Sequence, residues 1–358
     1  MNMKWSWLLI AVGLASIVTV SARSCTMLTK QPSERQSEQA TPQPSPDSSP
    51  SSNSSVETLI QAGDRFHKER KLVEAHDAYQ KATQINPKNA EAFAKLGFIL
   101  IVSAKPTQAI AAYQKAIALN PKDIESHNML SSLLRMGGKR VEAIAVLRKA
   151  VQTSPNSAES YRLLGLNLAY EDNLAEASEA CNRAIQLKPD YAQAYSCRGI
   201  ILTSQGKLDE AISAYQKSIK LLSAESSNSN LDPGLQKLPL SIHYYHLSLA
   251  FTAQGKRSEA VDTYNLALKI SEPLLSPIVN SSPTSPRASV EIFYRQVPLS
   301  AKYFATPHKQ LGIALKDKGQ LEEAIFVFQL AKELFAKQNN QEQVAAIDDL
   351  LKGIKRTQ

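Results

Sequence analysis

A period of 34 residues constrains the fold of this chain more than any other feature of its sequence. Three kinds of residue recur at that step: a proline, an alanine and a glycine that serine replaces once. These columns are Pro87, Pro121, Pro155 and Pro189; Ala75, Ala109, Ala143, Ala177 and Ala211; and Gly63, Gly97, Ser131, Gly165 and Gly199. Self-similarity at such a period is the signature of stacked units, each of which buries its apolar face against its neighbours.

Two columns of bulky residues keep the same step. They are Leu59, Phe93, His127, Tyr161 and Tyr195, and then Tyr79, Tyr113, Leu147, Cys181 and Tyr215. The columns predict two antiparallel helices per unit. Small residues let the two helices approach, bulky residues fill the space between them, and the proline ends the second helix. Histidine and cysteine in these columns, including His308 in a later unit, are therefore predicted to be core residues.

One copy of the unit shows the whole pattern. It reads Phe93-x-x-Leu96-Gly97-x-x-Leu100, then Ala109-x-x-x-Tyr113 and Pro121. In period and pattern the chain resembles the tetratricopeptide repeat family. The resemblance implies an all-α fold: a right-handed α-solenoid of about seven antiparallel helix-pair repeats with a C-terminal capping helix.

The columns also predict where the repeats begin and end. Repeats one to five occupy 56–225, repeat six 241–274 and repeat seven 305–338, and residues 339–358 form the capping helix and tail. Two insertions, 226–240 and 275–304, hold much of the proline and are predicted to be irregular. The apolar stretch 290–299 is expected to fold back on the array or to extend a repeat helix.

The N-terminal 55 residues lie outside this pattern. Residues 1–24 are predicted to be a signal peptide or a membrane anchor, because 5–22 carry no charge and Lys4 precedes them. Cys25 adds a third alternative, a lipoprotein, although Arg23 does not suit that motif. Residues 25–55 are rich in Ser and Pro and predict a disordered tether. All three alternatives place the repeats on the periplasmic or lumenal side of a membrane, in a bacterial envelope or thylakoid.

In the family the first helix of each repeat lines a concave groove that holds the partner. The resemblance therefore implies a non-enzymatic protein-interaction scaffold, and its layout is similar to exported or membrane-anchored bacterial members that assist assembly of membrane or envelope complexes. The mid-helix groove positions are Asp64, Phe98, Ser132, Leu166, Ile200, Leu249 and Ile313, with Asn128, Arg135, Arg162 and Tyr170 beside them. The apolar majority favours an extended or helical partner, unless these residues pack against adjacent helices instead.

The net charge suggests a second function. Forty-one Lys and Arg against 33 Asp and Glu give a formal net charge of +8. Part of the excess recurs every 34 residues on the second helices, at Lys81, Lys115, Lys149, Arg183 and Lys217. Such a ladder could bind an anionic lipid surface or nucleic acid. Glutamates recur beside it and offset it, and no aromatic residues alternate with it as single-strand binding would need, so nucleic acid is not the favoured partner.

Neither catalytic nor cofactor-binding residues are predicted. His243 and His246 lie at i, i+3 on one predicted helix face, but a third metal ligand is not evident beside them. Cys181 and Cys197 lie on consecutive predicted helices. The sequence leaves open whether they are separate buried thiols or form a disulfide in an oxidising compartment.

Overall fold

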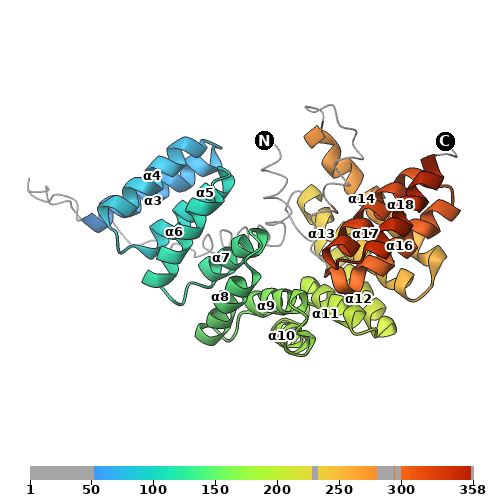
Figure 1. The fold of residues 1–358 in the computed structure, drawn as a ribbon. Coiled ribbons are helices and arrows are strands. Elements are labelled where there is room, and N and C mark those ends of the chain that lie inside the picture. Colours follow the sequence, from blue (N-terminus) through green and yellow to red (C-terminus); the bar gives the residue numbers. More distant parts are fainter. Residues whose placement is uncertain (1–51, 228–232, 280–293, 295–299, 356–358) are drawn as a thin grey trace, which may run out of the picture. The chain divides into compact units, whose positions relative to one another are not determined.

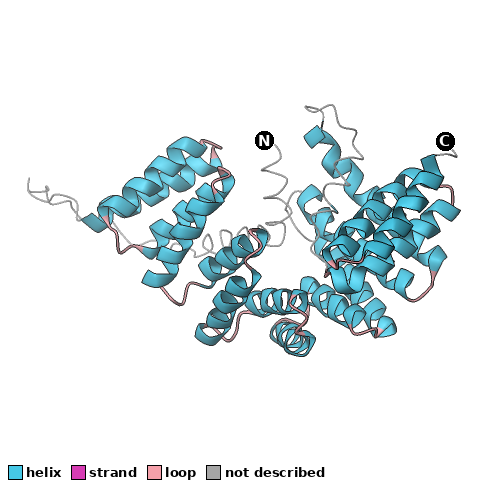
Figure 2. Ribbon diagram, in the orientation of Figure 1, coloured by secondary structure: helices cyan, strands magenta, loops and turns pink. Residues whose placement is uncertain are grey.

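The computed structural model describes residues 52–227, 233–279, 294 and 300–355. Within these ranges the chain forms fifteen helices joined by short loops and no strand (Figures 1 and 2). Fourteen of the helices form seven antiparallel pairs, and α18 follows the last pair. This architecture confirms the predicted all-α solenoid. The chain divides into two compact units, Met1–Pro155 (unit 1) and Asn156–Gln358 (unit 2).

The first unit contains repeats one to three. Its helices are α3 (Ser52–Lys68), α4 (Leu72–Ile85), α5 (Ala90–Val102), α6 (Pro106–Leu119), α7 (Ile124–Met136) and α8 (Arg140–Thr153). Tyr79 and Tyr113 lie in its core, each 2% exposed. A Cβ atom built on Gly97 would lie 2.9 Å from the Tyr113 ring, which is why this column requires a small residue. Asn89 and Asp123 cap the first helices of repeats two and three by accepting backbone N–H groups.

The second unit contains repeats four to seven. Its helices are α9 (Ala158–Tyr170), α10 (Leu174–Leu187), α11 (Ala192–Ser204), α12 (Leu208–Ser227), α13 (Pro233–Ala253), α14 (Arg257–Val279), α16 (Ala301–Asp317), α17 (Leu321–Lys337) and α18 (Gln341–Lys355). The first helix of repeat seven, α16, packs on α13 and also contacts α11, two repeats earlier (Figure 1). The capping helix α18 packs on α17.

The turn inside each repeat holds one residue in the left-handed backbone region. In repeats three, five, six and seven this residue is a glycine, for example Gly138 with φ of 78° and Gly206 with φ of 75°. In repeats one, two and four it is Arg70, Ala104 and Asp172, whose φ angles are 59°, 57° and 63°. A residue with a Cβ atom strains the backbone in this region and glycine does not. The backbone of these three turns is therefore more strained than that of the other four.

The helices differ from the predicted boundaries at five places, one of which is the start of α16 at Ala301 rather than at 305. α3 begins at Ser52, inside the predicted tether, and α12 continues to Ser227. α13 begins at Pro233 and α14 continues to Val279, so the described parts of both predicted insertions are helical rather than irregular. Two prolines lie inside helices instead of ending them: α13 continues through Pro239 and α16 through Pro307. Residues 1–51, including Cys25 and the predicted signal or anchor, lie outside the described residues.

Candidate partner-binding face

The predicted groove positions fall into two groups. Phe98, Leu166 and Ile313 are half-buried on α5, α9 and α16. Ile200 on α11 and Leu249 on α13 are buried, with 6% and 0% of their surface exposed. A partner could therefore contact the first group directly, whereas contact with Leu249 requires a rearrangement. Ile200 and Leu249 lie on α11 and α13, which both contact α16, and the polar groove position Ser132 on α7 is buried as well.

Phe98 is the centre of the first-helix face of unit 1. Its ring packs at the edge of two apolar clusters, one in repeats one and two and one in repeats two and three. The His67 imidazole meets it edge-on, with ring centroids 5.2 Å apart. Burial lowers the pKa of His67, so the imidazole is neutral at physiological pH. The face thus offers an apolar ring beside a neutral hydrogen-bonding group.

Asp64 joins the first two repeats on the same face. Its carboxylate accepts hydrogen bonds from the Tyr79 hydroxyl at 2.7 Å and from the Lys95 ammonium at 2.8 Å. Burial and the hydrogen bond to Asp64 raise the pKa of Tyr79. The Lys95 and Asp64 side chains are 36% and 38% exposed, so water screens this ion pair and it supplies orientation rather than stability.

Repeat three contributes mainly polar groups. Asn128 and Ser132 are buried, at 8% and 6% exposed, and Arg135 is half-buried. The predicted polar positions therefore lie on one helix, α7, but only Arg135 presents a substantial side-chain surface. A serine is small enough for larger neighbours to cover, which the sequence pattern by itself does not reveal.

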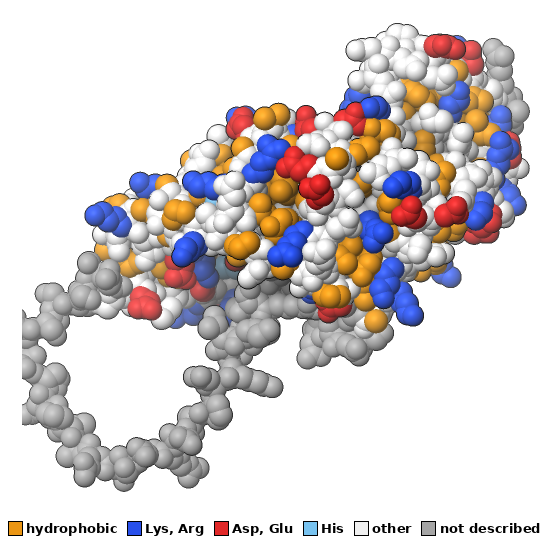
Figure 3. All heavy atoms as spheres, turned by 90° about the horizontal axis from the view of Figure 1, so that it is seen from below, with side chains coloured by type: hydrophobic (Ala, Val, Ile, Leu, Met, Phe, Trp, Pro, Cys, Tyr) orange, Lys and Arg blue, Asp and Glu red, His pale blue; other side chains and the backbone are white. Residues whose placement is uncertain are grey.

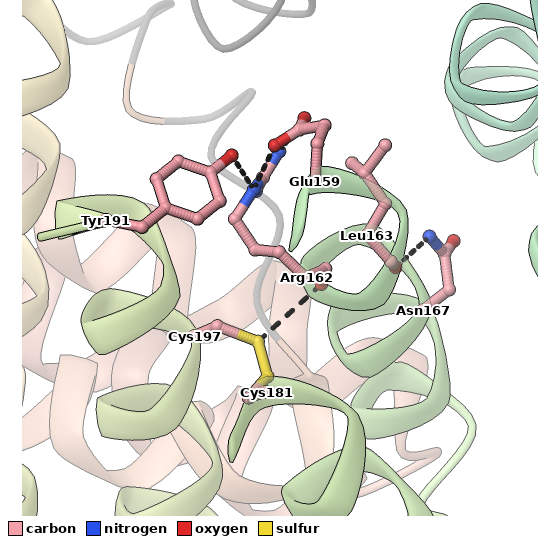
Figure 4. Close-up of a disulfide and its surroundings, with 7 residues drawn as sticks. All are labelled: Glu159, Arg162, Leu163, Asn167, Cys181, Tyr191 and Cys197. Atoms are coloured by element: carbon pink, nitrogen blue, oxygen red, sulfur yellow. Dashed lines mark hydrogen bonds and ion pairs between the residues drawn. A yellow bond between two sulfur atoms is a disulfide. The ribbon is translucent and has the colours of Figure 1, made fainter. Parts of the chain in front are cut away.

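Arg162, predicted as a polar contact for a partner, is instead held inside unit 2. Its guanidinium donates to both Glu159 carboxylate oxygens, at 2.9 and 2.6 Å, and to the Tyr191 hydroxyl at 3.0 Å (Figure 4). The Arg162 residue is only 4% exposed. A bidentate pair with such burial fixes the geometry between α9 and the start of α11. Arg162 is thus a structural link between repeats four and five.

Cys181 and Cys197 form a disulfide directly below this ion pair (Figure 4). It connects α10 to α11, with Cα atoms 6.1 Å apart, and neither residue is more than 1% exposed. The Cys197 sulfur lies 3.7 Å from the Arg162 carbonyl oxygen. A Cβ atom on Gly165 would lie 2.5 Å from the Cys181 sulfur, so the disulfide occupies the space that an aromatic ring fills in other repeats. Of the two alternatives that the sequence left open, the structure therefore shows the disulfide.

The core of repeats five to seven is unusually polar. Ser218 donates to the Ala192 carbonyl at 2.5 Å, so its one hydroxyl hydrogen is used and His243 Nδ1, 2.8 Å away, is the donor to Ser218. His308 Nδ1 donates to the Phe304 carbonyl at 2.5 Å, and His308 Nε2 accepts from the Tyr245 hydroxyl at 2.6 Å. A ring that donates from Nδ1 and accepts at Nε2 is neutral, as His308 is here, and the predicted core position of His308 is confirmed at 2% exposed.

Burial determines the charge of all three histidines in this core. It lowers the pKa of His243 and of His246 to about 3 and that of His308 to about 4. Both ring nitrogens of His246 are buried without a hydrogen-bond partner. Within the described ranges, no group of three or more His, Cys, Asp or Glu side chains could hold a metal ion. Among the described residues, His243 and His246 thus have no further ligands of the kind that a metal site needs.

Tyr294 from the second predicted insertion enters the same core. It is 2% exposed, and its ring centroid lies 4.5 Å from that of Tyr245. Its hydroxyl lies 3.4 Å from Ser271 Oγ on α14. Tyr294 therefore packs against repeat six, while the other residues of the stretch 290–299 lie outside the described residues.

Contacts that the sequence analysis missed join repeat seven to repeat four. The Asp172 carboxylate, in the turn between α9 and α10, accepts hydrogen bonds from the Lys302 ammonium and the Tyr303 hydroxyl at the start of α16. These residues are 130 and 131 positions away from Asp172. The only local signal was an aspartate at the left-handed turn position that Gly138 and Gly206 occupy in neighbouring repeats.

The predicted basic ladder is exposed at all five positions, Lys81, Lys115, Lys149, Arg183 and Lys217. Acidic and basic side chains alternate with apolar ones on the face shown in Figure 3. The mixture is that of an ordinary solvated surface rather than of a concentrated basic patch.

Comparison with known proteins identifies the fold family. Sequence models of the tetratricopeptide repeat match residues 66–134, 192–223 and 244–273. The chain belongs to the tetratricopeptide repeat family. Among curated proteins, none matches this tetratricopeptide repeat chain significantly.

Solved structures agree on the fold. A tetratricopeptide repeat protein from Parabacteroides merdae is 18% identical, covers 82% of this chain over 99% of its own, and gives a TM-score of 0.55. The APC/C hetero-tetramer Cut9-Hcn1 gives 0.54 at 14% identity, over 85% of this chain and 47% of that one. MamA is 25% identical over 51% of this chain and 100% of its own, with a TM-score of 0.44.

The described helices also bear on membrane association. None of those in 52–227, 233–279 and 300–355 is both long enough and apolar enough to cross a membrane. The predicted N-terminal segment is not among them.

Proposed function

We propose that this tetratricopeptide repeat protein is a non-enzymatic scaffold that binds a segment of a partner protein on its first-helix face. The partner segment inserts apolar side chains against Phe98 in unit 1 and against Leu166 in unit 2. Polar groups beside these positions, Arg135 and Tyr170, orient the segment. The repeat fold supports a role in protein interaction. The binding of an apolar segment on this face is the part that we propose.

One observation carries this proposal. The same mid-helix position is apolar and half-buried in three separate repeats, at Phe98, Leu166 and Ile313. A surface position with no role other than contact with water would favour a polar residue. An apolar side chain that is already partly ordered by its neighbours loses little conformational entropy when a partner covers it.

A set of charge-introducing variants tests the proposal. Phe98→Glu and Leu166→Glu are each expected to abolish recovery of the cross-linked partner from intact membranes, because a carboxylate would be buried against apolar groups. Helicity and the melting temperature should stay close to those of the unchanged protein.

Val141→Glu is the matched control. Val141 is 72% exposed on the second helix α8, so the same change of charge there should leave partner recovery unchanged. If Phe98→Glu and Leu166→Glu retain the partner while remaining folded, the first-helix face is not the binding surface.

We further propose that the repeats act outside the cytoplasm, in assembly of a membrane or envelope complex. Two observations support this location: the uncharged segment 5–22, and the buried Cys181–Cys197 disulfide, since disulfides persist in oxidising compartments. Alkylation of intact cells followed by fractionation tests it. Cytosolic recovery with both cysteines alkylated would contradict the proposal, and an unchanged distribution of Cys25→Ala would exclude a lipid anchor.

A further inference from the structure

We infer that Asp172, Lys302 and Tyr303 form a latch that holds α16 across unit 2 and closes the first-helix face of repeats five and six. The latch consists of one carboxylate in the repeat-four turn and two donors at the start of repeat seven. It is a conformational device that does not depend on the identity of any partner.

The first argument is the number of interactions that converge on Asp172. Its carboxylate forms an ion pair with Lys302 and a hydrogen bond with Tyr303. The Lys302 ammonium also lies 5.1 Å from the centroid of the Tyr303 ring, so the three groups form one cluster. Hydrogen bonding to both donors lowers the pKa of Asp172, which keeps the carboxylate charged.

The second argument is the backbone at Asp172. Its φ of 63° lies in the left-handed region, at a turn position that is glycine in repeats three, five, six and seven. Aspartate tolerates this region better than most residues, and Arg70 and Ala104 also occupy it, so the turn by itself does not require a carboxylate. Its two long-range contacts account for a carboxylate at this place.

The third argument is what α16 covers. It contacts α11 and α13, and the groove positions on those two helices, Ile200 and Leu249, are buried. Among the other apolar groove positions, Phe98 on α5 and Leu166 on α9 are half-buried. Movement of α16 away from α13 would thus open an apolar face that is closed in the described conformation.

The attraction that forms the latch is weak. The Lys302 and Asp172 side chains are 61% and 46% exposed, so salt screens their attraction. Exposed ion pairs shift such equilibria by about two- to fivefold, so the latch adjusts a position of α16 that the buried Phe304 and Leu311 and the His308–Tyr245 hydrogen bond also hold. An acidic segment that binds Lys302, or a basic segment that binds Asp172, would also weaken the ion pair and shift the equilibrium towards the open state.

Thiol accessibility at Leu249 tests this inference. In a Cys25→Ala, Leu249→Cys protein the native disulfide leaves one free thiol, at a fully buried position of α13, whose rate of reaction with a maleimide reports opening. Asp172→Gly removes the carboxylate and suits the left-handed backbone, so the turn itself should stay folded. We expect it to raise the labelling rate about two- to fivefold. Adding 0.5 M NaCl should have a similar effect in the protein that retains Asp172 and none in Asp172→Gly.

Two controls separate a latch from general destabilisation. Arg70→Gly makes the same change of residue in unit 1, at a left-handed turn position with no carboxylate, and should leave labelling at Leu249→Cys unchanged. A thiol at Phe98→Cys should react equally fast with and without Asp172→Gly. An unchanged rate at Leu249→Cys in Asp172→Gly, or an equal increase at Phe98→Cys, would overturn the inference.

Discussion

Units 1 and 2 use the same helix-pair repeat but differ in what holds their repeats together. In unit 1 the tyrosine and glycine columns pack with apolar neighbours, and its exposed Asp64–Lys95 pair joins adjacent repeats. Unit 2 adds a disulfide, a buried Glu159–Arg162 pair and contacts that span three repeats. The disulfide and the Glu159–Arg162 pair lie inside the unbroken 34-residue period, whereas the contacts of Asp172 reach a repeat that follows both insertions.

The largest expected difference between the units is their response to acid. The pKa values of His243, His246 and His308 in the folded protein lie below the unfolded value of 6.5. The unfolded chain therefore binds more protons, and stability falls as the pH drops through 6.5 and continues to fall towards about 3. At pH 5 each histidine costs about 2 kcal/mol relative to pH 8, or about 6 kcal/mol together.

Hydrogen exchange at the two pH values, corrected for the intrinsic rates, measures this effect by segment. Protection of α13 and α16 should fall steeply at pH 5, while that of α5 changes much less, because the His67 imidazole that contacts it is only half-buried. His246→Phe should remove about a third of the pH dependence. Equal losses in the two units would contradict the comparison.

The disulfide should give the next largest effect. Cys181 and Cys197 are separated by 16 positions, and a loop of this size closed by a disulfide contributes about 3 kcal/mol. Cys197→Ala is expected to lower the urea midpoint of unit 2 accordingly and to abolish the effect of a reductant. Cys25→Ala is the control and should change neither. A reductant that shifts the Cys197→Ala midpoint as much as that of the unchanged protein would refute the prediction.

The smallest effect concerns the left-handed turn positions, which both units share. Ala104→Gly in unit 1 should stabilise the protein by about 0.5–1 kcal/mol, because glycine adopts a positive φ without strain. Gly206→Ala in unit 2 should destabilise it by a similar amount for the same reason. Thermal melts of the two variants check both signs, and a loss of stability in Ala104→Gly would show that the turn needs its side chain.

The core of the repeats could be predicted from the sequence because each column repeats a local requirement. Tyr79, Tyr113 and Tyr215 are all buried as predicted, since a ring on the second helix must fill the space beside a glycine on the first. The candidate site was predicted less well. Phe98 and Leu166 are half-exposed, but Arg162 lies in a buried ion pair and Leu249 is fully buried. Periodicity places a residue on a helix face without showing which later helix covers that face.

The sequence by itself determined the family, the helix pairs and the residues between them, because these depend on spacings within one repeat or its neighbour. Only the tertiary structure decided that Cys181 meets Cys197, that three neutral histidines share one core, and that Lys302 and Tyr303 meet Asp172. The contacts of Lys302, Tyr303 and His308 depend on how α16 lies after the second insertion. The 34-residue pattern does not encode that placement, because the insertion breaks the register from which the rest of the array follows.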